Sequence, residues 1–193
     1  KALKLQKTDS VIVTPRSFVV SASCVINLGL RPIFADIDSN GNLNIEGIKK
    51  AYNKLKLKED FMMTYGDGLA NISIKNLLKF HRKNKSKVTL TAVRPKQRYG
   101  VLKIKKNQIT YFDNENTKAE TYVNGGYFVI NKECIKKIKN NKTYWEQEPL
   151  SFFAKRKKLF AFKHNGFWKS LDTLKDKNDF NKLYNKKTYP WKI

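Results

Sequence analysis

FMMTYGDG, at residues 61–68, is the stretch that decides how this sequence should fold. Phe61 to Tyr65 form a short apolar run of the kind found in buried strands, and Gly66-Asp67-Gly68 is a turn that would end it. A strand that is apolar on both faces is typical of an α/β sheet with helices on each side. We therefore expect Phe61 to Tyr65 to be a central strand, buried on both faces.

Strand and helix patterns alternate after this turn. Apolar residues recur at helical spacing over 72–81, and further helices are predicted at 148–157 and 177–184. The predicted strands lie at 88–93, 100–104, 108–112, 126–130 and 160–164, with a hairpin turn at 105–107. The alternation predicts an α/β fold with a mixed, mainly parallel sheet flanked by helices.

The residues before the turn have the pattern of a parallel βαβ unit. Val11 to Val13 and Ile33 to Asp36 are β-rich, and the helical stretch between them begins near Ser17 and ends before Gly29. We expect the two strands to be adjacent and parallel, with a right-handed crossover. The lysine-rich stretch at 54–58 is the candidate boundary, which divides the chain into 1–56 and 57–193.

Composition limits the classes of function. The formal net charge of +24 would attract a polyanion. However, lysine is spread along the whole chain, and no zinc-finger, RRM or KH signature accompanies it, so we expect no nucleic-acid partner. The sequence has no apolar run of about 20 residues and no signal-peptide pattern at its start, which predicts a cytoplasmic protein without a membrane partner. Cys24 and Cys134 are isolated and are expected to be buried, unpaired hydrophobic residues.

The first part of the chain resembles a known family. Residues 10–38 contain a Pro-x-x-Phe turn that ends at Phe18 and a Pro-x-Phe-x-Asp-Ile-Asp segment at 32–38. Both are similar to the DegT/DnrJ/EryC1 family of pyridoxal-phosphate sugar aminotransferases, in which the residue at Phe18 would stack on the cofactor ring. The family's cofactor-binding lysine motif is missing, so we expect a structural fragment that does not bind pyridoxal phosphate.

From residue 61 onward, several separated blocks resemble the glucose-1-phosphate cytidylyltransferases, which are sugar nucleotidyltransferases. The blocks are TYGDG at 64–68, RYG at 98–100, NGGYF at 124–128, WEQEPL at 145–150 and GFWxxLDTLxDK at 166–177. The resemblance implies an incomplete nucleotidyltransferase fold. It also implies transfer of a cytidylyl group from CTP to glucose 1-phosphate, giving CDP-glucose and pyrophosphate for polysaccharide biosynthesis.

The same resemblance implies a Mg²⁺ cofactor and two catalytic carboxylates. Asp67 and Asp172 match the family's metal-binding aspartates, and Mg²⁺ prefers hard oxygen ligands of this kind. Without the family context, Asp67 would be interpreted as a turn residue and Asp172 as the N-cap of the last helix. The prediction requires the fold to bring the two together.

Six further residues are implied to bind substrate. They are Tyr65, Arg98, Gly100, Asn124, Gly125 and Glu146. The alternatives are structural, because Asn-Gly is a common turn. Trp145 and Trp168 are expected to be core aromatics, and His164 is expected to pack or hydrogen-bond rather than to catalyse.

Two parts of the family pattern are absent from the printed sequence. It contains no Gly-Gly-x-Gly-Thr-Arg loop, which holds the triphosphate in the family. Glu115 occupies the place of a lysine that contacts the sugar phosphate, and Lys118 is a candidate substitute. We therefore expect a truncated or impaired enzyme, completed by a partner chain or by homo-oligomerisation. The alternative is a non-catalytic sugar-phosphate-binding or assembly module.

Overall fold

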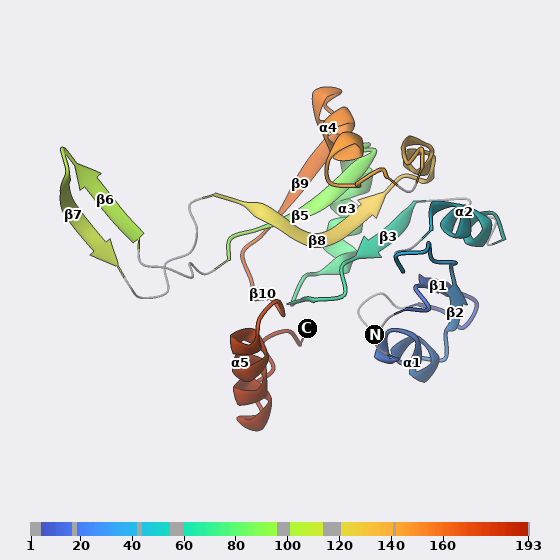
Figure 1. The fold of residues 1–193 in the computed structure, drawn as a ribbon, viewed down its shortest axis with the longest axis horizontal. Coiled ribbons are helices and arrows are strands. Elements are labelled where there is room, and N and C mark those ends of the chain that lie inside the picture. The colour runs from blue at the N-terminus through green and yellow to red at the C-terminus, as the bar shows by residue number, and fades with distance from the viewer. Residues whose placement is uncertain are drawn as a thin grey trace.

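A four-stranded sheet lies at the centre of the protein (Figure 1), for which a computed structural model describes residues 5–16, 19–41, 44–54, 60–95, 101–113, 121–140 and 142–192. The strand order is β3-β8-β5-β9. β8 (Val123–Ile130) pairs antiparallel with both β3 (Phe61–Thr64) and β5 (Val88–Val93), whereas β5 pairs parallel with β9 (Leu159–His164). The predicted α/β fold with a mixed sheet is confirmed, although antiparallel pairs prevail in this sheet where mainly parallel pairing was expected.

Helices cover both faces of this sheet. On one face, Leu150 and Phe153 of α4 (Glu148–Lys155) join a buried cluster with Val88 and Phe128. On the other face lies α3 (Ile74–Lys83), whose Phe80 ring meets the Phe162 ring of β9 edge to face. Burial of apolar side chains between these layers is the main source of stability expected for such a fold.

β3 is an edge strand, which corrects the prediction of a central one. Within the described residues its one strand neighbour is β8. Phe61 and Met63 pack against the buried cluster, whereas Met62 is 37% exposed and Thr64 is also exposed. The apolar run misled the prediction because Met62 is apolar but points away from the core. The strand is therefore buried on one face.

The N-terminal residues form the predicted parallel unit. β1 (Ser10–Val13) pairs parallel with β2 (Arg31–Phe34), and α1 (Val20–Asn27) lies between them in the chain. Gly29 has a φ of 72°, the left-handed conformation that commonly ends a helix. Ser17 and Phe18 lie outside the described residues.

The N-terminal unit contacts the sheet through the helix that follows it. Tyr52 of α2 (Ile45–Lys54) packs edge to face on Phe61, with the ring centroids 6.4 Å apart. Its hydroxyl also lies 3.4 Å from the carbonyl of Lys132, in the short helix η1 (Lys132–Lys137). The predicted division between 56 and 57 falls on residues outside the described ranges and stays a prediction.

Two smaller ladders complete the described strands. β4 (Gly68–Ala70) pairs antiparallel with β10 (Trp168–Ser170). β6 (Val101–Lys105) and β7 (Gln108–Asp113) form the predicted hairpin, which stands away from the four-stranded sheet in Figure 1. Its turn residues Lys106 and Asn107 both have positive φ, as a two-residue hairpin turn requires.

The chain closes with α5 (Leu174–Asn185). Thr173 begins this helix with a capping box, in which Thr173 and Asp176 satisfy each other's backbone amides. No helix in the described parts of the chain has the length and apolar character needed to cross a bilayer.

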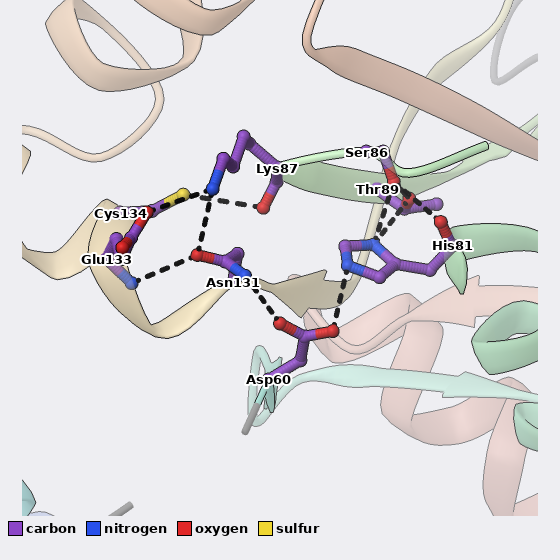
Figure 2. Close-up of polar contacts among 8 residues, drawn as sticks. All are labelled: Asp60, His81, Ser86, Lys87, Thr89, Asn131, Glu133 and Cys134. Atoms are coloured by element: carbon purple, nitrogen blue, oxygen red, sulfur yellow. Dashed lines mark hydrogen bonds and ion pairs between the residues drawn. The ribbon is translucent and has the colours of Figure 1, made fainter. Parts of the chain in front are cut away.

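A buried polar network ties α3 to the sheet (Figure 2). The His81 ring is 1% exposed, and its Nδ1 lies 2.8 Å from the Thr89 hydroxyl and 2.9 Å from that of Ser86. Nε2 lies 3.3 Å from a carboxylate oxygen of Asp60, whose other oxygen accepts a hydrogen bond from Asn131. The network joins residues on α3, at one end of the β3–β8 pair and in β5, so its role is structural.

The two cysteines differ in their surroundings. Cys134 is buried, as predicted, and its thiol lies 3.4 Å from the carbonyl of Lys87. The prediction for Cys24 is wrong, because this side chain is exposed. Val25 is the buried residue of this turn of α1, so Cys24 beside it faces solvent.

Candidate functional site

Three predicted substrate residues meet in one hydrogen-bonded cluster. The Tyr65 hydroxyl, just after β3, donates to Glu146 Oε1 at 2.6 Å. The Asn124 amide in β8 donates to the same oxygen at 2.7 Å and lies 3.4 Å from the Tyr65 hydroxyl. These residues are far apart in the sequence, so the fold assembles the cluster from three separate blocks.

The two glycines after Asn124 are required by close packing. A Cβ on Gly125 would lie 2.8 Å from Val93 Cγ1 and 3.0 Å from the Thr91 carbonyl oxygen. Gly126 has a φ of 77°, and a Cβ there would lie 3.0 Å from the Tyr65 ring. The Gly126 amide also donates to Asn124 Oδ1, which fixes the orientation of the Asn124 side chain. The Asn-Gly-Gly block is thus part of a strand rather than a turn.

The β4–β10 ladder is fastened beside this cluster by two hydrogen bonds. The Trp168 indole donates to the Gly125 carbonyl at 2.8 Å, and the Tyr127 hydroxyl donates to the Gly68 carbonyl at 2.7 Å. Both donors lie within the sequence blocks that carry the resemblance, yet neither was predicted to have a role in the site. The sequence signal for such a role is the indole N–H of Trp168 and the hydroxyl of Tyr127, because these groups need a hydrogen-bond partner when the ring is half-buried.

The two aspartates lie at the same end of the β4–β10 ladder, with Asp67 just before β4 and Asp172 just after β10. The Leu171 amide donates to the Asp67 carbonyl at 2.8 Å, so Asp172 comes one residue after the backbone partner of Asp67. Both side chains are exposed, and Asp172 accepts a hydrogen bond from the Ser170 hydroxyl at 2.7 Å. Thr173 is the cap of α5, so the alternative role of Asp172 as the N-cap is wrong.

The donor set of these aspartates fits Mg²⁺. Mg²⁺ in enzymes is usually held by one or two carboxylates, with waters and substrate phosphates filling the other positions. Among the described residues no group of three or more His, Cys, Asp or Glu side chains is placed to hold a metal. Two carboxylates alone would leave the other Mg²⁺ positions to waters and substrate oxygens.

The environment of Tyr65 keeps its phenol protonated. Burial raises the pKa of Tyr65, and the hydrogen bond to the Glu146 carboxylate and the charge of Asp67 raise it further, while Asn124 opposes them. At neutral pH the residue is therefore a hydrogen-bond donor and not a base. The influence of the Asp67 charge also indicates that the aspartate lies within electrostatic reach of the cluster.

The fold places the predicted residues as follows. Tyr65, Asn124, Gly125 and Glu146 lie together, with Asp67 and Asp172 on the ladder fastened to them. Arg98, Gly100, Glu115 and Lys118 lie outside the described residues, so their predicted roles stay predictions.

The three other residues considered in the sequence have structural contacts. Trp145 packs edge to face on Phe128 at 6.3 Å between ring centroids. His164 Nε2 lies 3.1 Å from the Phe167 carbonyl. Trp168 fastens the ladder to β8, as described above. The packing expected of Trp145 and the hydrogen bond expected of His164 are present, whereas Trp168 is half-buried and lies outside the buried cluster.

Comparison with known proteins gives two family matches. The DegT/DnrJ/EryC1/StrS aminotransferase family matches residues 1–58, and the nucleotidyl transferase family matches residues 35–185. Among curated relatives, the glucose-1-phosphate cytidylyltransferases of Salmonella typhimurium and Salmonella typhi are each 41% identical over 145 residues, covering 75% of this chain and 56% of theirs.

A solved structure agrees at the level of the fold. It is described as a glucose-1-phosphate thymidylyltransferase of Bacillus anthracis, and it superposes with a TM-score of 0.62 at 15% identity, covering 90% of this chain and 74% of that one. The chain spans about half the length of the curated relatives, 56% in each case. The nucleotidyl transferase match covers most of the chain, including the β4–β10 ladder with its two aspartates and the cluster of Tyr65, Asn124 and Glu146. The chain therefore belongs to the nucleotidyl transferase family.

Proposed function

We propose that this chain carries the sugar-binding and metal-binding portion of a glucose-1-phosphate cytidylyltransferase. The reaction would transfer the cytidylyl group of CTP to glucose 1-phosphate, forming CDP-glucose and releasing pyrophosphate. Asp67 and Asp172 would hold Mg²⁺, and Tyr65, Asn124, Gly125 and Glu146 would bind the hexose. The two curated relatives of Salmonella carry this activity in their names.

The convergence of Tyr65, Asn124 and Glu146 is the observation that supports this proposal most strongly. Each residue comes from a different block of the sequence, and they share one carboxylate oxygen at 2.6 and 2.7 Å. Structural needs alone would not place an exposed carboxylate at the centre of such a cluster, because a solvated carboxylate needs no partners. A preorganised set of acceptors and donors at a strand end is what sugar hydroxyls require.

The cluster has capacity left for a ligand. An ionised carboxylate accepts about four hydrogen bonds, and Glu146 Oε1 accepts two from the protein. Glu146 itself is exposed, so the remaining capacity is accessible to hydroxyl groups of a sugar. Gly125 would contribute through its backbone beside Asn124, because the space that a side chain would take is filled by Val93 and the Thr91 carbonyl.

The metal would neutralise charge on the phosphates that meet during transfer. The protein's own task is to position two anions and to exclude misaligned encounters. The printed sequence contains no glycine-rich triphosphate loop, and losing one preorganised donor typically costs about 10²–10³-fold in rate. We therefore expect little cytidylyl transfer by the 193-residue chain alone.

Two measurements test the proposal. The first is pyrophosphate release from CTP and glucose 1-phosphate with Mg²⁺, for which we expect a rate far below that of an intact enzyme. The second is calorimetric binding of glucose 1-phosphate at millimolar Mg²⁺, compared between the wild type and Asp67→Asn or Asp172→Asn. Asp36→Asn is the matched control, because Asp36 is an exposed aspartate of the N-terminal unit.

The outcomes separate enzyme from binding module. Magnesium-dependent binding that both site variants lose and the control keeps would support the proposed site. Binding without any transfer, even after a nucleotide-binding partner is added, would favour the non-catalytic sugar-phosphate-binding module. Binding that is equal in all four proteins would show that the aspartates hold no metal, and the proposal would then be wrong.

A further inference from the structure

We infer that Arg94 and Lys163, gathered over the ring of Tyr122, form the subsite for the phosphate group of the sugar phosphate. This inference rests on the proposed function and adds residues that no sequence block pointed to. Arg94 Cζ lies 4.4 Å from the centroid of the Tyr122 ring, and Lys163 Nζ lies 5.4 Å from it. Two cations from different parts of the chain therefore share one aromatic anchor.

The strand register places this pair beside the hexose cluster. Ala92 of β5 is paired with Asn124 of β8 on one side and with Lys163 of β9 on the other. Paired residues project to the same face of a sheet, so the Asn124 amide and the Lys163 side chain lie on one face, two strands apart. Neighbouring strands are about 4.8 Å apart, which puts the two positions roughly 10 Å from each other.

Arg94 and Tyr122 lie next to Lys163. Arg94 directly follows β5 and Tyr122 directly precedes β8, and the ring of Tyr122 brings Arg94 next to Lys163 because both cations contact it. The opposite face is occupied differently, since Phe162 beside Lys163 packs on α3. The cations thus flank the face that carries the Tyr65 cluster and α4, and not the face that α3 covers.

Among the described residues, no carboxylate pairs with either cation. Both Arg94 and Lys163 are exposed. A guanidinium over an aromatic ring keeps its N–H donors in its own plane, where they can bind two phosphate oxygens.

The chemistry of the pair fits a phosphate monoester. Such a group carries a charge of about −1.5 to −2 near neutral pH and offers three acceptor oxygens. A neutral hexose would gain nothing from the two charges, whereas a hexose phosphate held by Asn124 and Glu146 could extend its anionic end across Ala92. The predicted Glu115 substitution removes a cation from the family pattern, and this pair supplies two.

A second cation pair in the protein provides a matched control. Lys137 Nζ lies 4.0 Å and Arg156 Cζ 3.8 Å from the centroid of the Phe152 ring. Arg156 precedes β9, whereas Lys163 is near its C-terminal end, so the control pair lies toward the opposite end of the sheet. Replacing either pair removes one lysine and one arginine that lie over an aromatic ring, so the two double variants have the same net charge.

The experiment compares Arg94→Gln/Lys163→Gln with Lys137→Gln/Arg156→Gln. Binding of glucose 1-phosphate and of uncharged methyl α-glucoside is measured by NMR titration at millimolar Mg²⁺, after thermal melting shows each variant to be folded. A charge-assisted hydrogen bond contributes about 1.5–3 kcal/mol, less at an exposed site, so we expect the site variant to bind glucose 1-phosphate about tenfold more weakly. The control should stay within about twofold of wild type, and methyl α-glucoside binding should be unchanged in both.

Each outcome bears on one of the two proposals. Wild-type binding of glucose 1-phosphate that the site variant retains would overturn the phosphate subsite and leave the proposed function standing. If both double variants lost glucose 1-phosphate affinity equally, the effect would be one of net charge, and the phosphate subsite would also be overturned. If the wild type binds neither sugar, the proposed function fails and this inference fails with it. Arg94→Lys adds a graded test, since it keeps the charge but loses the planar fork and should show a smaller loss.

Discussion

Substituting Gly125 with alanine should destabilise the protein at the centre of the candidate site. The new Cβ would lie 2.8 Å from Val93 Cγ1, 3.0 Å from the Thr91 carbonyl oxygen and 3.3 Å from Val93 Cγ2. The carbonyl belongs to the backbone of β5, the strand paired with β8, so it cannot move without distorting the sheet. The strand must therefore shift, and the Gly125 carbonyl that accepts the Trp168 indole shifts with it.

The expected cost is that of overpacking a buried strand. Adding a methyl group to a well-packed interior typically costs about 1–3 kcal/mol. In a chain of this length, each kcal/mol lowers the melting temperature by about 2–4 °C. Gly125→Ala should thus melt clearly below wild type in a thermal scan followed by circular dichroism. It should also weaken glucose 1-phosphate binding, because the Asn124 amide next to it moves.

Two further variants make this reasoning refutable. A Cβ at Gly66 would meet nothing within 4 Å, so Gly66→Ala should leave stability within about 1 kcal/mol of wild type. Val93→Ala removes two of the three close contacts, so the double variant should be less destabilised than the sum of the single ones, by about 0.5–3 kcal/mol. A Gly125→Ala protein that melts with wild type, or strictly additive effects, would show that the predicted steric conflict does not exist.

Two other predictions concern stability away from the site. Burial lowers the pKa of His81, with Asp60 opposing and Arg82 adding to the effect, so as the pH falls through about 6.5 the unfolded chain takes up the proton first and stability declines. The urea midpoint of the wild type should be lower at about pH 5.5 than at about pH 7.5, and the difference should be smaller in His81→Gln. The same difference in both proteins would contradict the prediction. Thr173→Ala removes the cap of the last helix and should cost about 1 kcal/mol of unfolding free energy, whereas exposed Lys177→Ala in the same helix should cost less than about 0.5 kcal/mol.

The candidate site residues could be named from the sequence because they lie in short blocks that resemble a known family, and the structure shows that one of these blocks also has strict local requirements. The Asn124 block needs glycine at two successive positions, one for space and one for a positive φ. Such requirements are visible in a sequence as an unusual residue pair, even without coordinates. The contact between Tyr65 and Glu146 was not predictable from either block alone, since it depends on how β3 and the start of α4 meet across the sheet.

The failures of prediction share a physical cause. Met62 and Cys24 are apolar or weakly polar residues in regular elements, and both were expected to be buried. Exposure is decided by which neighbours cover an element, and a local pattern does not contain that information. The same limit applies to Arg94 and Lys163, which look like ordinary solvated cations in the sequence. The register of three strands places Lys163 on the face that carries Asn124, and the contact with the Tyr122 ring places Arg94 next to it.

The contacts that build the candidate site make binding separable from catalysis. Tyr65, Asn124 and Glu146 are joined to one another, and the aspartate ladder is fastened to β8 by Trp168 and by the hydroxyl of Tyr127. All of these residues lie in the part of the chain that follows α2, and each bond is made between members of that part. The proposed hexose and metal positions would therefore depend on the four-stranded sheet, whereas cytidylyl transfer would also require groups that hold a triphosphate. Binding of glucose 1-phosphate without nucleotide transfer is consequently consistent with these contacts, and activity gained on adding a nucleotide-binding partner is the result that would distinguish the enzyme from a binding module.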